Sequence, residues 1–340
     1  MVKRSSPSPV RSTLVTADLH LSDNHRDGYR HAFLRYLPDL VEKHNARRLL
    51  ILGDLTEEKD RHGAWLVNEI VEHISALAEL CPVYIIRGNH DYITAEHPFY
   101  TFVCKIKNVY WYNEPHTKSM RGLGNCLFLP HTTNYEQDWD EINYKEYDWI
   151  FAHQTFTGAV GENGQTLDGI PRHIFPRDAK VISGDVHVPQ AIRPVTYVGA
   201  PYLIDFGDDY EPRMLLLDGS KIKSIPCKGA QKRLVDIISL TDLKKAEKNL
   251  QPGDVLKVRV TLDPSQTGEW AITQAAVRDW GAERGFLVHA VPVVSGGSPA
   301  APKRSKTSPR NDKQLIEAYV KRRKASKAVL ETGLRLLEEG

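Results

Sequence analysis

The 340-residue chain contains no long hydrophobic run and few cysteines. No apolar stretch approaches the roughly 20 residues that a membrane-spanning helix needs. The N-terminus, MVKRSSPSPVR, lacks the apolar segment of a secretory signal. The four cysteines are widely spaced without a Cys-x-x-Cys pair, which argues against a zinc ribbon or a disulfide framework and fits buried thiols in a reducing compartment. We therefore expect a cytoplasmic protein.

Two catalytic motifs are also missing from the sequence. There is no P-loop pattern G-x-x-x-x-G-K-[ST], so any dependence on ATP has to come from another chain. There is no G-x-S-x-G elbow, so a serine nucleophile of that kind is not expected. With 41% hydrophobic and 26% charged residues, the chain has the composition of a globular protein.

Charge is distributed unevenly along the chain. The net charge is +2, but residues 303–327 carry +8 and residues 1–11 carry +3, which leaves −9 on the remainder. An acidic body therefore carries a basic C-terminal segment. The run Lys321, Arg322, Arg323 and Lys324 reads either as a solvated helix face or as a contact for DNA phosphates or a partner.

Short runs of β-branched and aliphatic residues alternate with helical patterns in the first part of the chain. Between the first three runs, apolar residues recur at the spacing of one helix face, although Pro38 is expected to kink or shorten the first helix. This alternation predicts an α/β layered sheet with crossover helices. The predicted strands are residues 13–17, 48–52, 83–86, 149–152 and 180–183.

Later residues read as strands and turns alone, and we expect them to form hairpins in a second sheet packed on the first. These are residues 108–113, 125–130, 195–202 and 213–226, the last with a turn at Asp218-Gly219. Beyond residue 229, strands and helices alternate in the order of a small α+β unit. The predicted segments are a disordered leader at 1–11, a large α/β domain at 12–228, the small domain at 229–294, a flexible linker at 295–312 and amphipathic helices at 313–340.

Five of the predicted strands end directly in residues that can bind a metal. In open α/β sheets, ligands bind outside the carboxyl ends of the strands, so these side chains should converge on one crevice. Seven side chains that offer imidazole, carboxylate and one amide group suit two divalent cations. The glycines near Asp54, Asn89 and Asp185 allow the backbone to turn sharply there. The seven candidate ligands are Asp18, His20, Asp54, Asn89, His153, Asp185 and His187.

Taken singly, these motifs are weak, because a lone histidine is more often an ordinary core or surface residue than a ligand. The ordered set of blocks at five strand ends is much more specific. His25 and His131 also follow predicted strands and are candidates to line the crevice.

The order D-x-H, G-D, G-N-H-D, H, G-x-x-H resembles the calcineurin-like metallophosphoesterase superfamily. Within it the chain resembles the SbcD nuclease family, above all its compact bacteriophage members, because YVGAPYLIDFGDDYEPRMLLLD at 197–218 is similar to the segment that follows the last metal motif there. The resemblance implies a two-sheet α/β metallophosphoesterase sandwich at 12–228, a capping domain at 229–294 and partner-binding helices at 313–340. It implies a DNA exonuclease and endonuclease subunit that works in recombination, repair or phage DNA processing.

The resemblance also assigns roles to individual residues. Asp18, His20 and His187 would hold the first metal, and Asp54 would bridge. Asn89, His153 and Asp185 would hold the second. His90 would contact the scissile phosphate as a catalytic residue.

Asp185 departs from the family pattern, because the last motif is usually G-H-x-H and a carboxylate stands here in place of the first histidine. A carboxylate is a harder ligand than imidazole, so it shifts the metal preference of the site toward Mn²⁺ or Mg²⁺. We expect the site to bind two Mn²⁺ ions.

The family further implies DNA and an SbcC-like ABC ATPase as partners, the latter bound by the C-terminal helices, and a homodimer formed through the catalytic domain near residues 62–112. Two other functions stay open at this point. One is a general phosphoesterase acting on small molecules or phosphoproteins, and the other is a non-catalytic scaffold on DNA.

Overall fold

The computed structural model describes residues 12–94 and 97–295. The predicted leader, nearly all of the predicted linker and the predicted C-terminal helices, with the basic run Lys321 to Lys324, lie outside the described residues. Contacts divide the chain into two units. In the second unit, Ser295 donates from its N–H and its hydroxyl to the Leu262 carbonyl (2.7 and 3.0 Å). Apart from the last residues of two strands (Leu262, Val293 and Val294), everything below concerns the first unit, which includes residues 12–261 and 269–292.

The first large sheet has the strand order β12-β11-β1-β2-β3-β4. Its strands β1 to β4 are parallel, whereas β11 is antiparallel to β1 and β12 is antiparallel to β11. Every residue of β1, β2 and β3 is buried, which is why their sequences are nearly continuous aliphatic runs. The strands are β1 (Thr13–Thr16), β2 (Leu49–Leu52), β3 (Val83–Ile86), β4 (Val109–Tyr112), β11 (Arg213–Asp218) and β12 (Lys221–Pro226).

The second large sheet has the order β5-β6-β7-β8-β10-β9, with β6, β7, β8 and β10 parallel. Antiparallel strands close both of its edges. The strands are β5 (His116–Met120), β6 (Gly124–Leu129), β7 (Trp149–His153), β8 (Val181–Gly184), β9 (Gln190–Ile192) and β10 (Val195–Tyr197).

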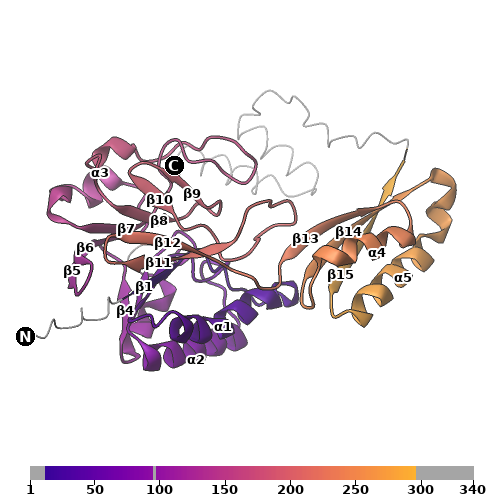
Figure 1. Cartoon of the computed structure of the whole chain (residues 1–340), viewed down its shortest axis with the longest axis horizontal. Helices are drawn as coiled ribbons and strands as arrows, with labels where there is room; N and C mark the ends of the chain where they lie inside the picture. Colours follow the sequence, from indigo (N-terminus) through magenta and orange to yellow (C-terminus); the bar gives the residue numbers. More distant parts are fainter. Residues whose placement is uncertain (1–11, 95–96, 296–340) are drawn as a thin grey trace, which may run out of the picture. The chain divides into compact units, whose positions relative to one another are not determined.

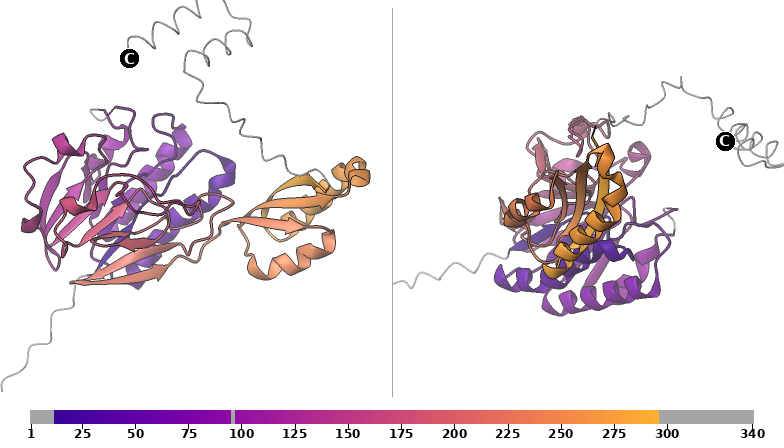
Figure 2. Two further views of the ribbon diagram at one scale, coloured as in Figure 1. Left: turned by 90° about the horizontal axis from the view of Figure 1, so that it is seen from above. Right: turned by 90° about the vertical axis from the view of Figure 1, so that its right-hand side faces the viewer.

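Side chains that alternate along the strands build separate cores on the two faces of each sheet. In β2, Leu49 and Ile51 pack with α1 (Gly28–Lys43) and α2 (Ala64–Leu80), whereas Leu50 and Leu52 point to the second sheet. The layers are therefore helices, first sheet and second sheet, as Figures 1 and 2 show, with loops and the short α3 (Tyr135–Asp138) outside the second sheet. This confirms the predicted two-sheet α/β sandwich.

Two predicted strand placements were wrong, and so was the shortening expected as one effect of Pro38. Residues 109–112 form no hairpin in the second sheet but pair in parallel with β3, and the 213–226 hairpin joins the first sheet beside β1. Apolar patterning shows that a strand is buried but does not reveal its neighbour. Pro38 does not shorten α1, which runs from Gly28 to Lys43, because buried residues on both sides of the proline, such as Leu37 and Leu40, anchor it to the sheet.

A third sheet of three strands, β13-β14-β15, follows in the chain, with β13 and β14 parallel. Its element order agrees with the order predicted beyond residue 229, while the predicted domain boundaries stay a prediction. Its elements are β13 (Lys232–Ile237), α4 (Leu243–Ala246), β14 (Val255–Leu262), α5 (Trp270–Glu283) and β15 (Leu287–Val294).

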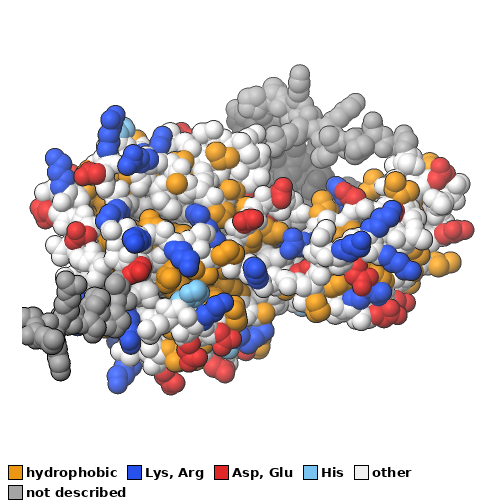
Figure 3. Space-filling model, viewed as in Figure 1, with side chains coloured by type: hydrophobic (Ala, Val, Ile, Leu, Met, Phe, Trp, Pro, Cys, Tyr) orange, Lys and Arg blue, Asp and Glu red, His pale blue; other side chains and the backbone are white. Residues whose placement is uncertain are grey.

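Polar contacts join residues at the start of this sheet to the sandwich, among them a hydrogen bond from Lys232 to the Ile204 carbonyl (2.9 Å). The Gln231 side chain accepts a hydrogen bond from the Leu203 N–H (2.7 Å), and Lys232 forms an ion pair with Asp27 (3.2 Å). No helix in the described ranges is both long and apolar enough to cross a membrane. Lys, Arg, Asp and Glu side chains of both signs are spread over the face of the molecule that Figure 3 shows.

Candidate metal centre

The structure brings all seven candidate ligands together at the carboxyl ends of five strands. Asp18 and His20 follow β1, Asp54 follows β2 and Asn89 follows β3 in the first sheet. His153 ends β7, while Asp185 and His187 follow β8 in the second sheet. The site therefore lies where the two sheets meet, rather than at the edge of a single sheet.

The backbone at these strand ends is held in an unusual conformation. Asp18, His20, Asp54 and Asp185 all have positive φ angles (55°, 42°, 51° and 80°), among seven such non-glycine residues in the described chain. This left-handed region costs energy and persists only where surrounding contacts enforce it, which is typical of functional sites. Such contacts are present, because the His20 N–H donates to the Asp54 carbonyl (2.9 Å) and the Asp185 N–H to the Asp18 carboxylate (3.0 Å).

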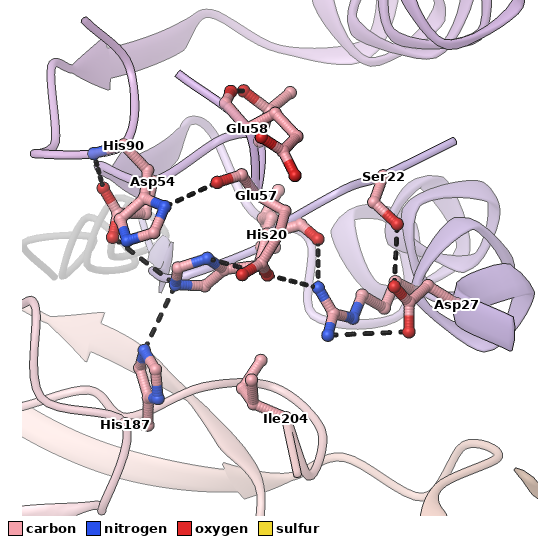
Figure 4. A network of polar contacts seen from close by, with 12 residues as sticks. His20, Ser22, Asp27, Asp54, Glu57, Glu58, His90, His187 and Ile204 are labelled. Atoms are coloured by element: carbon pink, nitrogen blue, oxygen red, sulfur yellow. Dashed lines mark hydrogen bonds and ion pairs between the residues drawn. The ribbon is translucent and has the colours of Figure 1, made fainter. Parts of the chain in front are cut away.

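Asp18, His20 and His187 form the first cluster, seen in part in Figure 4. The Nε2 atoms of the two histidines lie 3.1 Å apart, and Asp18 is fully buried. The buried Oδ2 atom of Asp18 has no hydrogen-bond partner. A buried carboxylate oxygen without a partner is costly, so its position beside two facing imidazole nitrogens fits a cation site.

Asp54, Asn89, His153 and Asp185 form the second cluster. The Nε2 atom of His153 lies 3.0 Å from the Asn89 amide, 3.3 Å from Asp54 and 3.7 Å from Asp185. Its Nδ1 donates to the Leu52 carbonyl (2.6 Å), which fixes the ring orientation and leaves Nε2 as the nitrogen that faces these oxygens. Nitrogen and oxygen donors of this kind suit Mn²⁺ or Mg²⁺.

The two clusters share a concentration of buried negative charge. Burial raises the pKa of Asp18, and the neighbouring charge of Asp54 adds to that shift. Burial also acts to raise the pKa of Asp54, but its ion pair and hydrogen bond with His153, together with His20, outweigh it and hold this pKa below its ordinary value. Asp54 lies between the clusters, at 3.4 Å from His20 and 3.3 Å from His153, as a bridging ligand would.

His90 lies beside the clusters without joining the ligand set. Its backbone N–H donates to Asp54 (2.9 Å), and its Nδ1 donates to the Glu57 carbonyl (2.6 Å). These two bonds leave Nε2 as the ring atom available to a bound molecule. Of the two further histidines considered, His131 lies near His153, with 6.3 Å between ring centroids, whereas His25 is exposed and makes no hydrogen bond or ion pair with the described site residues.

Four residues that support the site were not identified from the sequence. Glu57 faces the Nδ1 atom of His20 (3.3 Å), and Glu162 accepts from the Nδ1 atom of His187 (2.8 Å). The Thr155 hydroxyl donates to Asp185 (2.5 Å). Asp91 accepts from three backbone N–H groups, those of Gly88, Asp54 and Leu55. Asp91 belongs to the G-N-H-D block and could have been noticed there, but the other three have no sequence signal.

A chain of charged side chains extends from His20 of the first cluster to Asp27, as Figure 4 shows. Glu57 pairs with Arg30 (2.8 Å), whose other guanidinium nitrogen faces Asp27 (3.6 Å). Asp27 in turn accepts from Ser22 (2.7 Å) and pairs with Lys232 of β13 (3.2 Å). Hydrogen bonds and ion pairs with His20 and Arg30 hold the pKa of Glu57 below its ordinary value, so this carboxylate stays charged.

Comparisons with known proteins were made for the whole chain. A family model described as calcineurin-like phosphoesterase matches residues 12–217. The chain is 28% identical over 191 residues to a phosphoesterase of Invertebrate iridescent virus 6, which covers 49% of this chain and 62% of that protein. It is 40% identical over 86 residues to UDP-2,3-diacylglucosamine hydrolase of Shewanella pealeana, which covers 25% of this chain and 35% of that protein.

Both alignments thus span less than two thirds of these relatives' own length. Among solved structures, the chain is similar to the nuclease MPE of Pseudomonas putida, with 15% identity, a TM-score of 0.32, and coverage of 63% of this chain and 72% of that one. A likeness this weak carries no argument about function.

Proposed function

This chain belongs to the calcineurin-like phosphoesterase family, and from that premise we propose that it is an SbcD-like DNA nuclease subunit that uses two divalent metal ions, Mn²⁺ above all. Members of the family are metal-dependent phosphoesterases that typically bind two divalent metals. The donor atoms described above fit that requirement. The DNA substrate, the nuclease activity and the identity of the metal are the parts that we propose.

Each residue of the site has a proposed role. Asp18, His20 and His187 would hold the first ion, and Asp54 would be shared by both ions. Asn89, His153 and Asp185 would hold the second. When bound, two such ions supply Lewis-acid chemistry, which lowers the pKa of water and neutralises the negative charge of a phosphodiester.

His90 acts on the substrate itself in this proposal. Because its Nδ1 donates to the Glu57 carbonyl, its Nε2 is the ring nitrogen left to bond a phosphate oxygen. The carboxylates of Glu57 and Glu162 and the carbonyl of Leu52 orient the ligating imidazoles, which keeps their Nε2 lone pairs directed into the site.

One structural observation favours the nuclease over a general phosphoesterase. The third sheet is not merely appended, because Lys232 at the start of β13 is the last member of the ion-pair chain that begins at His20. A hydrolase of small phosphate esters does not need an additional sheet connected to its metal ligands. In the SbcD family a capping domain occupies this place in the chain, and here it would help to hold DNA.

The partners follow from the same resemblance. We propose that residues 313–340 bind an SbcC-like ABC ATPase, that Lys321, Arg322, Arg323 and Lys324 contact DNA or that partner, and that the catalytic domain forms a homodimer. The setting would be recombination, repair or phage DNA processing in the cytoplasm, that of the host if the chain is phage-encoded.

A second candidate, a hydrolase of small phosphate esters, is favoured by the 40% identity to UDP-2,3-diacylglucosamine hydrolase over 86 residues. A third candidate is a non-catalytic scaffold. The departure from the family pattern at Asp185 favours it, whereas the full set of seven converging ligand side chains argues against it.

The test is cleavage of end-labelled single-stranded and double-stranded DNA in Mn²⁺, Mg²⁺ or EDTA, with His90→Ala as the control variant. Cleavage in Mn²⁺ that is lost in EDTA and in the variant is the expected result. No cleavage of DNA, together with hydrolysis of a small phosphodiester by the same sample, would overturn the nuclease in favour of the second candidate. Inactivity toward both substrates would favour the scaffold.

A further inference from the structure

A cleft of about 840 Å³ lies beside the second sheet, outside the metal centre. We call it the arginine cleft, because three of its lining residues are Arg172, Arg177 and Arg193. Arg172 belongs to the segment between β7 and β8, Arg177 precedes β8, and Arg193 lies in the turn between β9 and β10.

The guanidinium groups of the cleft are of two kinds. Arg172 is fixed in place, because it donates to the carbonyls of Ile192 and Arg193 (both 3.2 Å). Arg177 and Arg193 are exposed, and neither has an ion-pair partner within the described part of the chain. Asp178 is the one acidic residue of the lining.

This positive charge stands on an acidic body. Outside residues 1–11 and 303–327, the chain has a net charge of −9. The cleft, with three arginines and one aspartate, is therefore locally positive on an otherwise acidic body. A local positive charge of this kind attracts an anionic ligand. Arginine, rather than lysine, suits phosphate because its planar fork makes paired hydrogen bonds.

Part of the cleft lining is apolar. Phe175 is 4% exposed and packs edge-on against Tyr144 and Phe156 (ring centroids 4.9 and 5.3 Å apart). Pro171 and Pro194 are the other apolar lining residues. Guanidinium groups beside apolar side chains suit a strand that presents both phosphates and unpaired bases.

The cleft is also connected to the metal centre through the chain. Thr157 lines the cleft, and Thr155, two residues earlier, donates to the candidate ligand Asp185. Backbone bonds between Thr155 and Ile170, and between Thr157 and Ile170, join this segment to the one that carries Arg172. A strand held in the cleft would therefore contact the same loop that positions a metal ligand.

We propose that the arginine cleft binds a single-stranded segment of the DNA substrate, with Arg177 and Arg193 on its phosphates. This inference rests on the proposed nuclease function and names a contact site for its substrate. We assign no phosphate contact to Arg172, because its Nη1 atom is already hydrogen-bonded to carbonyls. Its role is to hold the shape of the cleft.

The test uses the double variant Arg177→Gln, Arg193→Gln in the full chain. Its matched control is Lys43→Gln, Arg47→Gln, which removes the same charge from two exposed residues at the end of α1 and in the loop that follows it, outside both the cleft and the third sheet. Binding of a fluorescent oligothymidylate is measured by anisotropy in EDTA, where cleavage is absent, over a series of salt concentrations. Thermal unfolding shows whether each variant is folded.

We expect the arginine variant to bind at least about tenfold more weakly than the parent, with the slope of log K against log salt reduced by about 1.4, the value for two lost phosphate contacts on a single strand. The control should keep the parent's affinity and slope. An arginine variant that retains both, in a chain that cleaves DNA, would overturn this inference and leave the nuclease proposal standing. A parent chain that neither binds nor cleaves DNA would overturn both.

Discussion

The Nε2 atoms of His20 and His187 lie 3.1 Å apart, although His20 follows a strand of the first sheet and His187 follows a strand of the second. Each ring presents its Nδ1 to a carboxylate, from Glu57 (3.3 Å) and Glu162 (2.8 Å) respectively. Both lone pairs therefore point into one space between the sheets. Ligand geometry in this site depends on how the two sheets pack, rather than on any single loop.

Glu162→Gln should weaken the binding of one of two Mn²⁺ ions about 10- to 100-fold, because the carboxylate that orients His187 and increases its basicity is lost. Isothermal titration of the metal-free chain measures this change. Glu136→Gln is the matched control, since Glu136 is exposed and accepts a hydrogen bond from its neighbour Tyr135. Equal affinities for Glu162→Gln and the parent would show that the carboxylate does not support the ligand.

Asp185→Ala should abolish or strongly weaken the second ion while leaving the first in place. Asp185 lies 3.7 Å from His153 and accepts a hydrogen bond from the Thr155 hydroxyl (2.5 Å). Thr155→Val should have a smaller effect in the same direction, because the carboxylate stays but is no longer held. If Asp185→Ala binds two Mn²⁺ as tightly as the parent in calorimetry, Asp185 is not a ligand.

Gly53→Ala should destabilise the fold by about 2–4 kcal/mol, since Gly53 has a φ of 82° and a methyl group there would overlap the His153 ring. Gly28→Ala is the contrasting change, because Gly28 has a helical φ of −55° and open space around its Cα. It should stabilise the chain by about 0.4–1 kcal/mol. Denaturant unfolding of both variants gives the two values, and a Gly53→Ala chain as stable as the parent would contradict the packing described here.

In the metal-free chain, His131 should contribute a loss of stability as the pH falls from about 6.5 to about 4, while Asp91, whose burial raises its pKa to about 6, contributes in the opposite direction. Burial, followed by the positive charge of His153, lowers the pKa of His131 to about 4. The unfolded chain keeps the ordinary pKa of about 6.5, so it binds more protons than the folded chain in this window. The contribution reaches at most about 3 kcal/mol, because one pKa unit corresponds to about 1.4 kcal/mol.

His131→Gln tests this origin of the pH dependence. In EDTA, the unfolding free energy of the parent minus that of the variant should fall as the pH is lowered from 6.5 to 4. Parallel curves would show that His131 makes no such contribution.

The sequence predicts the candidate ligands at the strand ends better than the residues that orient them. Strand ends at Asp18, Asp54, Asn89, His153 and Asp185 were found because buried aliphatic runs stop where polar residues begin. The same local signal does not reveal which strands pair, so residues 109–112 were placed in the wrong sheet. Pairing depends on contacts between distant segments.

Glu162 and Thr155 show a second limit. Each bonds a candidate ligand that is 25 or 30 residues away in the chain, so no motif or periodicity connects the pair. Glu57 lies three residues after Asp54, but its side chain reaches His20 only because two parallel strands are adjacent. Such supporting contacts follow from the folded arrangement of the strands and not from their order.

The most direct measurement is the number of Mn²⁺ ions that the metal-free chain binds, determined by calorimetric titration alongside the His187→Ala and His153→Ala variants. Two ions per chain in the parent, and one in each variant with the other ion retained, is the result expected from two clusters that meet at Asp54. A parent chain that binds one ion or none, or variants that still bind two ions with the parent's affinities, would contradict a two-metal centre built from these residues.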